Sequence, residues 1–353
     1  MASDLPNTLQ ELAPDPARVD DEDRLVLIGT QAQERLGDFS EDVRSGLTSS
    51  PKRLSCAYLY DEAGSKIFEE ICDLPEYYLT RAETEILRSQ AEDILDDAPD
   101  DLTLVELGSG SSTKTRVLIE AYLKRHAKLH YVPIDISREM LEQSSGELLA
   151  DFPGLRVTAL AAEYMAGLHA LKDVAPGPKL VLWLGSNVGN FERPDAAAFL
   201  REVRRDLTPN DRLLMGIDLR KDRDTLEAAY DDAQGVTARF NLNLLQRINA
   251  ELGADFDLTG FRHRATYNEA AGRVEIYIDS LRDQDVRIDE LDLDVSFKKG
   301  ESMHTENSHK YGLREIDLLA EAAGYTTNGR WFDAEKRYSM NRIVPRVGSP
   351  ITS

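Results

Sequence analysis

The chain has 353 residues, which is enough for one large domain or for two smaller ones with a sizeable buried core. Its 64 Asp and Glu residues outnumber its 42 Lys and Arg residues, so the formal net charge is −22 at pH 7, and such an acidic balance argues against nucleic acid and anionic membranes as partners. Two cysteines, six histidines and the lack of a long apolar run predict a cytoplasmic protein without a disulfide framework, a metal site or a membrane-spanning segment.

The N-terminal part of the chain predicts an acidic leader followed by a helix. Residues 1–22 are rich in Pro, Asp and Ala and show no periodicity, which is typical of a disordered segment. From Arg24 to Leu47, apolar residues such as Ile28 and Phe39 recur at helical spacing. This stretch is therefore expected to be an amphipathic helix.

Aromatic residues gather around the proline turn that follows. Tyr60 precedes the stretch GSKIFEEI, and Tyr77 and Tyr78 follow it. Tyrosine places a hydroxyl at the wet end of an apolar pocket, so these three residues suggest a site for a polar ligand. A packed loop without a ligand is the alternative.

A glycine turn between a strand and a helix predicts a cofactor site. The stretch Leu102–Gly110 reads LTLVELGSG, an apolar strand that runs into an acidic residue and then a glycine turn. Glycine lets backbone N–H groups approach a bound cofactor closely. A dinucleotide fingerprint would need a third glycine where Thr113 stands, and the acidic residue suits a positively charged ligand. These features favour S-adenosylmethionine over NAD, although such a turn can also be mere fold punctuation.

Strands and helices alternate as far as residue 218. Asp135 ends the strand after the glycine turn and can accept hydrogen bonds from a ribose. Glu163 and Tyr164 follow the next strand, and Asn190 lies in a loop of small residues after the one beyond it. The order predicts a doubly wound parallel sheet that binds ligands at the carboxyl ends of its strands. These strands are expected at residues 129–134, 156–160, 179–184 and 212–218.

The pattern changes after Arg220. Helical spacing is followed by alternation of apolar and polar residues, which indicates antiparallel strands rather than further βα units. A parallel sheet that finishes in a strand hairpin is the usual layout of class I methyltransferases. The expected segments are helices at 225–252, antiparallel strands at 261–308, a helix at 313–323 and closing strands at 329–332 and 338–344.

Five blocks of sequence are long enough to compare with known families. In chain order they are YLYDEAGSKIFEEICDLPEYYLTRAE, VELGSGSSTKT, GSNVGNF, YDDAQGVTARFNLNLL and TENSHKY. From about Leu47 to Ile343 the chain resembles the L-histidine Nα-methyltransferase family, which makes hercynine in ergothioneine biosynthesis. The resemblance implies an α/β protein with a class I, Rossmann-like methyltransferase core. A second, α+β substrate-binding domain is formed by an N-terminal piece and an insertion. The implied boundaries are 1–22 for the leader, 23–81 with 220–309 for substrate binding, and 82–219 with 310–353 for S-adenosylmethionine binding.

The resemblance also implies the reaction and the cofactor residues. S-adenosylmethionine would trimethylate the α-amino group of L-histidine through mono- and dimethyl intermediates, leaving S-adenosylhomocysteine. This is the first step of ergothioneine biosynthesis, and a monomer that acts on a small molecule is expected. One departure concerns the adenine, where Ala162-Glu163 replaces the family's Gly-Asp pair. The matching cofactor positions are Gly108, Ser109, Gly110, Lys114, Asp135 (at the ribose), Glu163 and Tyr164.

For the substrate, the resemblance assigns Asn190 and Tyr230 to the carboxylate and Tyr60 to the α-amino group, with Tyr77 lining the pocket. Glu306 and Ser308 would contact the imidazole.

The imidazole assignment also makes chemical sense from the residues alone. Two positions apart on a strand, Glu306 and Ser308 face the same side. Neutral imidazole has one N–H donor and one bare nitrogen, so the carboxylate can accept from the first and the hydroxyl can donate to the second. Indole lacks the acceptor and phenyl lacks both groups, which would leave buried polar groups unpaired. On a surface strand the same two residues would mean nothing.

Ile276 leaves the substrate preference open. Family members that act on histidine often carry Met beside the ring, and a shorter, branched side chain changes the shape of the pocket. An Nα-methyltransferase for tryptophan or tyrosine is therefore the alternative, although Glu306 and Ser308 favour histidine. A second alternative is a cofactor-binding partner protein without catalysis, whose pocket residues should be damaged, whereas here they are intact.

Overall fold

The computed structural model describes residues 24–29 and 39–346, so the leader predicted at 1–22 lies outside the described part. The chain divides into two compact units. The first takes in the described part of residues 1–33 together with 91–182, and the second the described part of 34–90 together with 183–353. This division assigns no function to either unit, and the predicted domain boundaries stay predictions.

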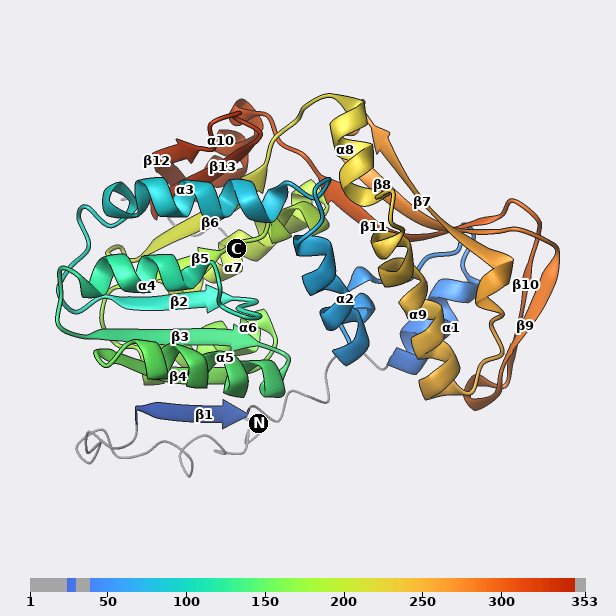
Figure 1. The fold of residues 1–353 in the computed structure, drawn as a ribbon, viewed down its shortest axis with the longest axis horizontal. Coiled ribbons are helices and arrows are strands. Elements are labelled where there is room, and N and C mark those ends of the chain that lie inside the picture. The colour runs from blue at the N-terminus through green and yellow to red at the C-terminus, as the bar shows by residue number, and fades with distance from the viewer. Residues whose placement is uncertain (1–23, 30–38, 347–353) are drawn as a thin grey trace, which may run out of the picture. The chain divides into compact units, whose positions relative to one another are not determined.

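The first unit is built around parallel strands in the order β1-β4-β3-β2-β5 (Figure 1). The two strands β2 and β5 are buried along their whole length, as expected for strands covered on both faces. The bounds of the strands are β1 (Leu25–Gly29), β2 (Thr103–Leu107), β3 (Leu129–Asp135), β4 (Leu155–Ala161) and β5 (Lys179–Trp183).

Three helices connect these strands: α4 (Thr115–Leu123), α5 (Arg138–Asp151) and α6 (Tyr164–Val174). The chain moves from β2 to β3 and on to β4 in one direction across the sheet, then returns past β2 to β5. Right-handed crossovers therefore place α4 and α5 on one face and α6 on the other. The reversal at β2 is a topological switch point, where open α/β sheets bind ligands beyond the carboxyl ends of their strands.

One prediction for this unit is wrong. The stretch from Arg24 to Leu47, expected to be a helix, begins with strand β1, which pairs in parallel with β4 from Leu25 opposite Val157 to Gly29 opposite Ala161. In the described part of this stretch, the helix is α1 (Phe39–Thr48). A short apolar run such as LVLIG fits a strand or a helix equally well, and here pairing with β4 decides.

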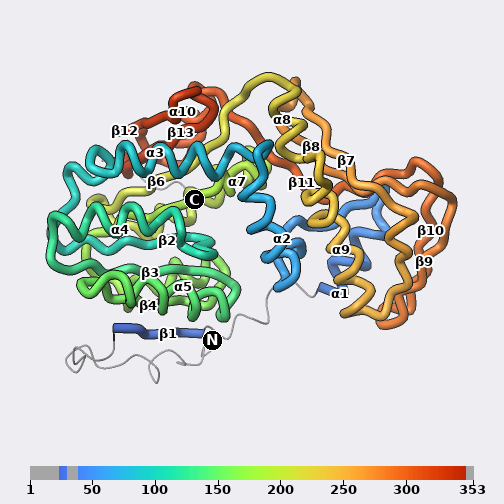
Figure 2. Tube along the Cα trace, viewed as in Figure 1, coloured from blue at the N-terminus to red at the C-terminus, as the bar shows by residue number. Residues whose placement is uncertain are grey.

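The second unit combines helices with antiparallel strands. Strand β8 lies between β7 and β11, β9 pairs with β10, and β13 lies between β6 and β12, always antiparallel. The tube trace in Figure 2 follows this part of the chain in blue near its beginning and from yellow to red near its end. The strands are β6 (Arg212–Asp218), β7 (Phe261–Asn268), β8 (Arg273–Ser280), β9 (Gln284–Ile288), β10 (Leu293–Phe297), β11 (Ser302–His309), β12 (Tyr325–Phe332) and β13 (Tyr338–Pro345).

The helices of this part are mostly amphipathic and contact the strands and each other; α9 packs on α2 and β7, and α8 packs on β7 and β8. With bounds, the helices are α2 (Glu62–Cys72), α3 (Leu79–Ile94), α7 (Arg193–Asp206), α8 (Arg223–Tyr230), α9 (Val236–Leu252) and α10 (Leu313–Ala322), with short 3-10 turns η2 (Cys56–Leu59), η3 (Asn187–Asn190), η4 (Leu258–Gly260) and η5 (Asp289–Leu291).

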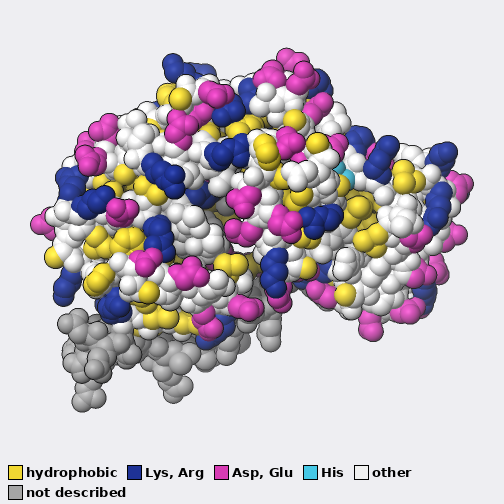
Figure 3. All heavy atoms as spheres, viewed as in Figure 1, with side chains coloured by type: hydrophobic (Ala, Val, Ile, Leu, Met, Phe, Trp, Pro, Cys, Tyr) yellow, Lys and Arg dark blue, Asp and Glu magenta, His cyan; other side chains and the backbone are white. Residues whose placement is uncertain are grey.

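The predicted fold class is confirmed: a parallel sheet of βα units is followed by helices, antiparallel strands and a closing hairpin. On the face drawn in Figure 3, acidic and basic side chains are interspersed. No helix in the described residues is long and apolar enough to cross a membrane.

Candidate functional site

The turn after β2 opens a backbone surface toward the carboxyl ends of the strands. Gly108 and Gly110 adopt φ angles of 69° and 47°, a left-handed conformation that favours glycine. A Cβ atom at Gly110 would meet no heavy atom within 4 Å. The glycine at this position therefore serves its backbone conformation and leaves the space beside it open to a ligand.

Asp135, at the end of β3, is tied to this turn. Its carboxylate accepts hydrogen bonds from the Gly110 N–H (2.9 Å) and the Ser137 N–H (3.0 Å). Burial raises the pKa of Asp135, while these N–H donors oppose the rise. Each carboxylate oxygen uses one lone pair on the backbone, so the other lone pairs can accept the hydroxyls of a ribose.

Buried side chains next to the glycine turn are joined by hydrogen bonds. Tyr131 of β3 donates a hydrogen bond to the Glu106 carboxylate, and the Ser112 and Tyr131 hydroxyl oxygens are 3.0 Å apart. Burial, followed by the charge of Glu106, raises the pKa of Tyr131 well above its usual value. The phenol therefore remains a donor to the carboxylate at neutral pH.

The remaining cofactor positions lie at the same ends of the strands. Glu163 and Tyr164 begin α6 directly after β4, and the Ala162 N–H donates to the Asp135 carbonyl over 2.9 Å. Lys114 precedes the first residue of α4. The Ser109 hydroxyl is buried and has no hydrogen-bond partner among the described residues, so a ligand can satisfy it. The first unit thus gathers all seven predicted cofactor residues at the ends of β2, β3 and β4, and they suit the ribose and the polar groups of S-adenosylmethionine.

The second unit contains a cavity lined by both apolar and polar side chains. All seven residues predicted to bind the substrate line it. They come from segments far apart in the sequence: the C-terminal end of η2, the turn before α3, η3, α8, β8 and β11. The residues that line the cavity include Tyr60, Phe68, Tyr77, Asn190, Tyr230, Thr237, Phe240, Asn241, His263, Ile276, Glu306 and Ser308.

One wall of the cavity is aromatic. The Tyr60 ring meets Phe68 and Phe240 edge-on, with ring centroids 5.4 and 5.3 Å apart. The Tyr77 ring meets Tyr230 in the same way at 6.1 Å. These contacts hold the tyrosine rings in place, so their hydroxyls are presented from a rigid apolar surface.

Polar groups of the imidazole site come from β11. Glu306 and Ser308 both lie on this strand and both line the cavity, which matches the expected strand geometry. Ile276 of β8 is the direct pairing partner of Glu306, and side chains of paired residues lie on the same face of a sheet. The isoleucine therefore stands beside the Glu306 carboxylate.

Glu306 is buried, with a side chain that faces the cavity. Burial raises the pKa of its carboxyl from 4.5 to about 7, and the nearby charge of Lys310 moderates the rise. A ligand that donates a hydrogen bond to this carboxylate would favour the ionised form.

Ser308 and Tyr230 are joined through a buried lysine. Their hydroxyl oxygens are 2.8 Å apart, and the Lys310 ammonium donates to Tyr230 over 2.7 Å and to Ser308 over 2.9 Å. The third contact of Lys310 is an ion pair of 2.8 Å with Asp218. Burial opposes the charge of Lys310, but Asp218 and Tyr230 outweigh burial and raise its pKa above the usual value. The lysine is therefore charged at neutral pH.

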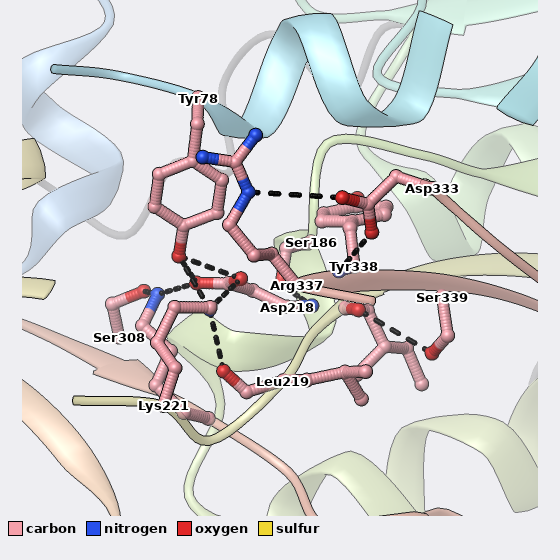
Figure 4. Close-up of polar contacts among 12 residues, drawn as sticks. Tyr78, Ser186, Asp218, Leu219, Lys221, Ser308, Asp333, Arg337, Tyr338 and Ser339 are labelled. Carbon is pink, nitrogen blue, oxygen red and sulfur yellow. Dashed lines mark hydrogen bonds and ion pairs between the residues drawn. The ribbon is translucent and has the colours of Figure 1, made fainter. Parts of the chain in front are cut away.

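Asp218 is the centre of a larger network (Figure 4). The Tyr78 hydroxyl donates to it over 2.8 Å, and Lys221 pairs with it over 2.6 Å and also donates to the Tyr78 oxygen over 2.5 Å. Burial raises the pKa of Asp218, but Lys310 and Lys221 lower it to below its usual value. Two cations thus hold one buried carboxylate ionised.

Asn190 is positioned by a strained loop after β5. Gly185 and Ser186 have φ angles of 72° and 58°, and the Gly185 N–H donates to the buried Glu83 carboxylate over 3.0 Å. Glu83 also accepts from the Tyr338 hydroxyl over 2.8 Å. These bonds anchor the loop that brings η3, and with it Asn190, to the cavity.

Another part of the cavity wall carries polar residues that the sequence analysis did not assign to the site. His263 contacts the Tyr230 carbonyl over 2.8 Å through Nε2, and Asn241 contacts His263 Nδ1 over 3.0 Å. Because the Asn241 amide also donates to the Tyr277 carbonyl over 3.1 Å, its oxygen points elsewhere and has no partner among the described residues. An N–H group of a ligand can satisfy this oxygen.

Two signals in the sequence could have identified Lys310 and Asn241 as residues of the site. Lys310 continues the two-residue spacing of Glu306 and Ser308, and it stands in the same block, TENSHKY. Asn241 stands in the block YDDAQGVTARFNLNLL. Asp218 gave no comparable signal, because its role depends on contacts with residues about 90 and 140 positions away along the chain.

The comparisons with known proteins agree with this geometry. Residues 39–344 match the family described as "Histidine-specific methyltransferase, SAM-dependent". The chain belongs to this family. It is 40% identical to a histidine N-alpha-methyltransferase of Mycolicibacterium smegmatis over 303 residues, 86% of this chain and 94% of that one. It is 40% identical to the protein of the same name from Mycobacterium tuberculosis, over 85% and 92%. It is also 33% identical to ergothioneine biosynthesis protein 1 of Neurospora crassa, over 80% of this chain and 32% of that one.

Membership of the family confirms the predicted enzyme class. The chain is a methyltransferase that uses S-adenosylmethionine and acts on a small molecule. The individual roles of the site residues are a separate matter and are taken up below.

Proposed function

We propose that this methyltransferase trimethylates the α-amino group of L-histidine to give hercynine, the first step of ergothioneine biosynthesis. The observation that carries the proposal is the pair formed by Glu306 and Ser308 in one cavity, 9% and 3% exposed. The pair supplies one acceptor and one donor on the same side of one strand. Neutral imidazole needs that combination, one acceptor for its N–H and one donor for its bare nitrogen.

Three residues are proposed to hold the carboxylate and the α-amino group of the substrate. Asn190 and Tyr230 hold the carboxylate, and Tyr60 orients the α-amino group. Burial raises the pKa of Tyr230, so this residue remains a neutral phenol that can donate a hydrogen bond. This property supports its proposed role. A neutral nitrogen lone pair is needed for attack, and holding it in line with the methyl group is the main contribution of the protein.

S-adenosylmethionine supplies the methyl group from a sulfonium and leaves as S-adenosylhomocysteine, with Gly108, Ser109, Gly110, Lys114, Asp135, Glu163 and Tyr164 as its proposed binding residues. The amine releases one proton to solvent before each transfer. The third methyl group leaves a quaternary nitrogen that carries no proton, so methylation ends there.

The domain assignment is proposed on the same basis. Residues 82–219 with 310–353 would bind the cofactor, and residues 23–81 with 220–309 would contribute most of the histidine site. A monomer is proposed as the active species.

Tryptophan and tyrosine are less suitable substrates for this cavity. Indole has an N–H for Glu306 but no acceptor for Ser308, and phenol places its polar group beyond the ring. A hydrogen bond to the ring that is not formed costs about 0.5–1.5 kcal/mol. A partner protein without catalysis is disfavoured too, because the glycine turn and the polar cavity are both intact.

The proposal is tested by incubating the purified protein with S-adenosylmethionine and L-histidine and analysing the products by mass spectrometry. Trimethylated histidine should accumulate together with one S-adenosylhomocysteine for each methyl group transferred. Glu306→Gln is the control, since it keeps the shape of the site and replaces the carboxylate. Turnover of the cofactor without methylated histidine, or equal histidine methylation by Glu306→Gln, would contradict the proposal.

A further inference from the structure

Lys310 is fully buried next to two residues of the proposed histidine site, and nothing in the reaction yet uses it. An ammonium group has three N–H donors and no acceptor. All three are engaged: by the Tyr230 hydroxyl at 2.7 Å, the Ser308 hydroxyl at 2.9 Å and the Asp218 carboxylate at 2.8 Å.

These contacts fix the direction of the hydrogen bonds. Tyr230 and Ser308 must both accept from the ammonium, because it cannot accept from them. Each hydroxyl proton therefore points away from Lys310. In the ligand-free structure one of the two protons bridges the 2.8 Å between the hydroxyl oxygens, and the other is available to the cavity. With a ligand present, both protons can turn to acceptors on the ligand.

We propose that Lys310 is a positioning residue that makes Tyr230 and Ser308 hydrogen-bond donors toward the substrate. This inference rests on the proposed function. Histidine offers two acceptors at matching places, a carboxylate oxygen for Tyr230 and the bare imidazole nitrogen for Ser308. Because Ser308 then donates, the imidazole N–H must point to Glu306, so the lysine also selects the tautomer that binds.

The network around Asp218 explains how a charged lysine is held in this place. Asp218 is the counter-ion of Lys310 and is itself shared with Lys221 and Tyr78. Lys221 donates to Tyr78, to Asp218 and to the Leu219 carbonyl, the last over 2.6 Å, and to neither hydroxyl of the histidine site. It is therefore a matched control: it is a second cation on the same carboxylate without a contact to the donors.

The test is a double-mutant cycle on histidine binding, measured by calorimetry in the presence of S-adenosylhomocysteine. If Lys310 directs the Ser308 hydroxyl, Ser308→Ala should weaken histidine binding about tenfold in the wild-type background and less than about threefold in the Lys310→Met background. In the Lys221→Met background, Ser308→Ala should again cost about tenfold. Affinity for S-adenosylhomocysteine should change less than about threefold in every variant that folds.

Equal effects of Ser308→Ala in the wild-type and Lys310→Met backgrounds would overturn the proposal. A Ser308→Ala effect that also falls below about threefold in the Lys221→Met background would overturn it too, since the effect on histidine binding would then come from the charge balance at Asp218. Should Lys310→Met not fold, Lys310→Gln gives the same test, because its amide can donate or accept and no longer fixes the direction of the hydrogen bonds. Failure of the wild-type protein to bind histidine would instead contradict the proposed function itself.

Discussion

Glu306 holds a carboxyl group in a cavity that has one aromatic wall, with Tyr60, Phe68 and Phe240 in contact. Burial raises its pKa to about 7, close to neutral pH. The ionised carboxylate accepts the imidazole N–H more strongly than the protonated carboxyl does. Proton uptake by Glu306 and histidine binding therefore compete for the same oxygens.

This competition predicts a pH-dependent affinity. As the pH falls through about 7, a growing fraction of Glu306 is protonated and accepts the imidazole N–H less strongly, so the affinity for histidine should fall. Protonation of the free imidazole, with an ordinary pKa of about 6.5, adds to the fall. Titration of histidine between about pH 6 and 8 measures the slope. In Glu306→Gln only the contribution of the ligand should remain, and identical slopes for the two proteins would count against this role.

Tyr60 is expected to act in the reaction more than in binding. Its ring is held by Phe68 and Phe240, so removal of the hydroxyl should leave the ring in place. Tyr60→Phe should lower the methylation rate about tenfold or more and weaken histidine binding less, because the hydroxyl directs the nitrogen lone pair. Single-turnover rates and calorimetric affinities separate the two effects. Equal losses would show that the hydroxyl only contributes to binding.

At the scale of elements, strands and helices with a clear period could be predicted from the sequence. The alternation after Phe261 became β7 to β11, and the two-residue spacing on β11 placed Glu306 and Ser308 in one cavity. Strand β1 could not be predicted, because its five residues carry no period of their own and become a strand through pairing with β4.

The buried network was equally beyond the reach of local patterns. A lysine two residues after Ser308 is visible in the sequence, but its burial depends on Asp218 at the end of β6 and on Tyr78 before α3. A charged group becomes a core residue only when its counter-ions are supplied by the tertiary structure. For this reason the family resemblance could name residues that line the site, and the two-residue spacing on β11 includes Lys310, but the contacts of Lys310 with Tyr230 and Ser308 required the tertiary structure.

Helix α10 offers a test of stability. Glu315 accepts the Gly312 N–H at the start of the helix and both N–H groups of Arg220 at 2.9 Å. Burial opposes its ionisation, but Arg220, the Gly312 N–H and Arg193 together lower its pKa from 4.5 to about 2. The stabilisation is therefore fully present above about pH 4.5 and is lost as the pH falls toward 2.

Glu315→Gln should accordingly lower the free energy of unfolding by about 1–2 kcal/mol at pH 7 and by less at pH 3. Urea denaturation at the two pH values measures the difference. Glu321→Gln on the same helix is the control, because its partner Arg346 is at 3.3 Å and both side chains are well exposed, so its effect should be small. A deficit of Glu315→Gln that is the same at both pH values would rule out this account.

At the scale of the whole molecule, the two kinds of site are built differently. The cofactor residues follow the carboxyl ends of successive parallel strands, which is a local and recurrent arrangement. The residues proposed to bind the substrate histidine come from six separate segments, so their arrangement depends on the complete tertiary fold. The net charge of −22 gives no sign of this interior, where the buried Lys310 and the partly buried Lys221 pair with one buried aspartate.

Substrate selection is the central claim, and a competition experiment tests it most directly. The purified enzyme is given S-adenosylmethionine and an equimolar mixture of L-histidine, L-tryptophan, L-tyrosine and L-phenylalanine, and the products are identified by mass spectrometry. Our account predicts trimethylated histidine as the dominant product, with Ile276 as a tolerated change in the wall of the cavity. Methylated tryptophan or tyrosine as the dominant product would contradict the roles given to Glu306 and Ser308.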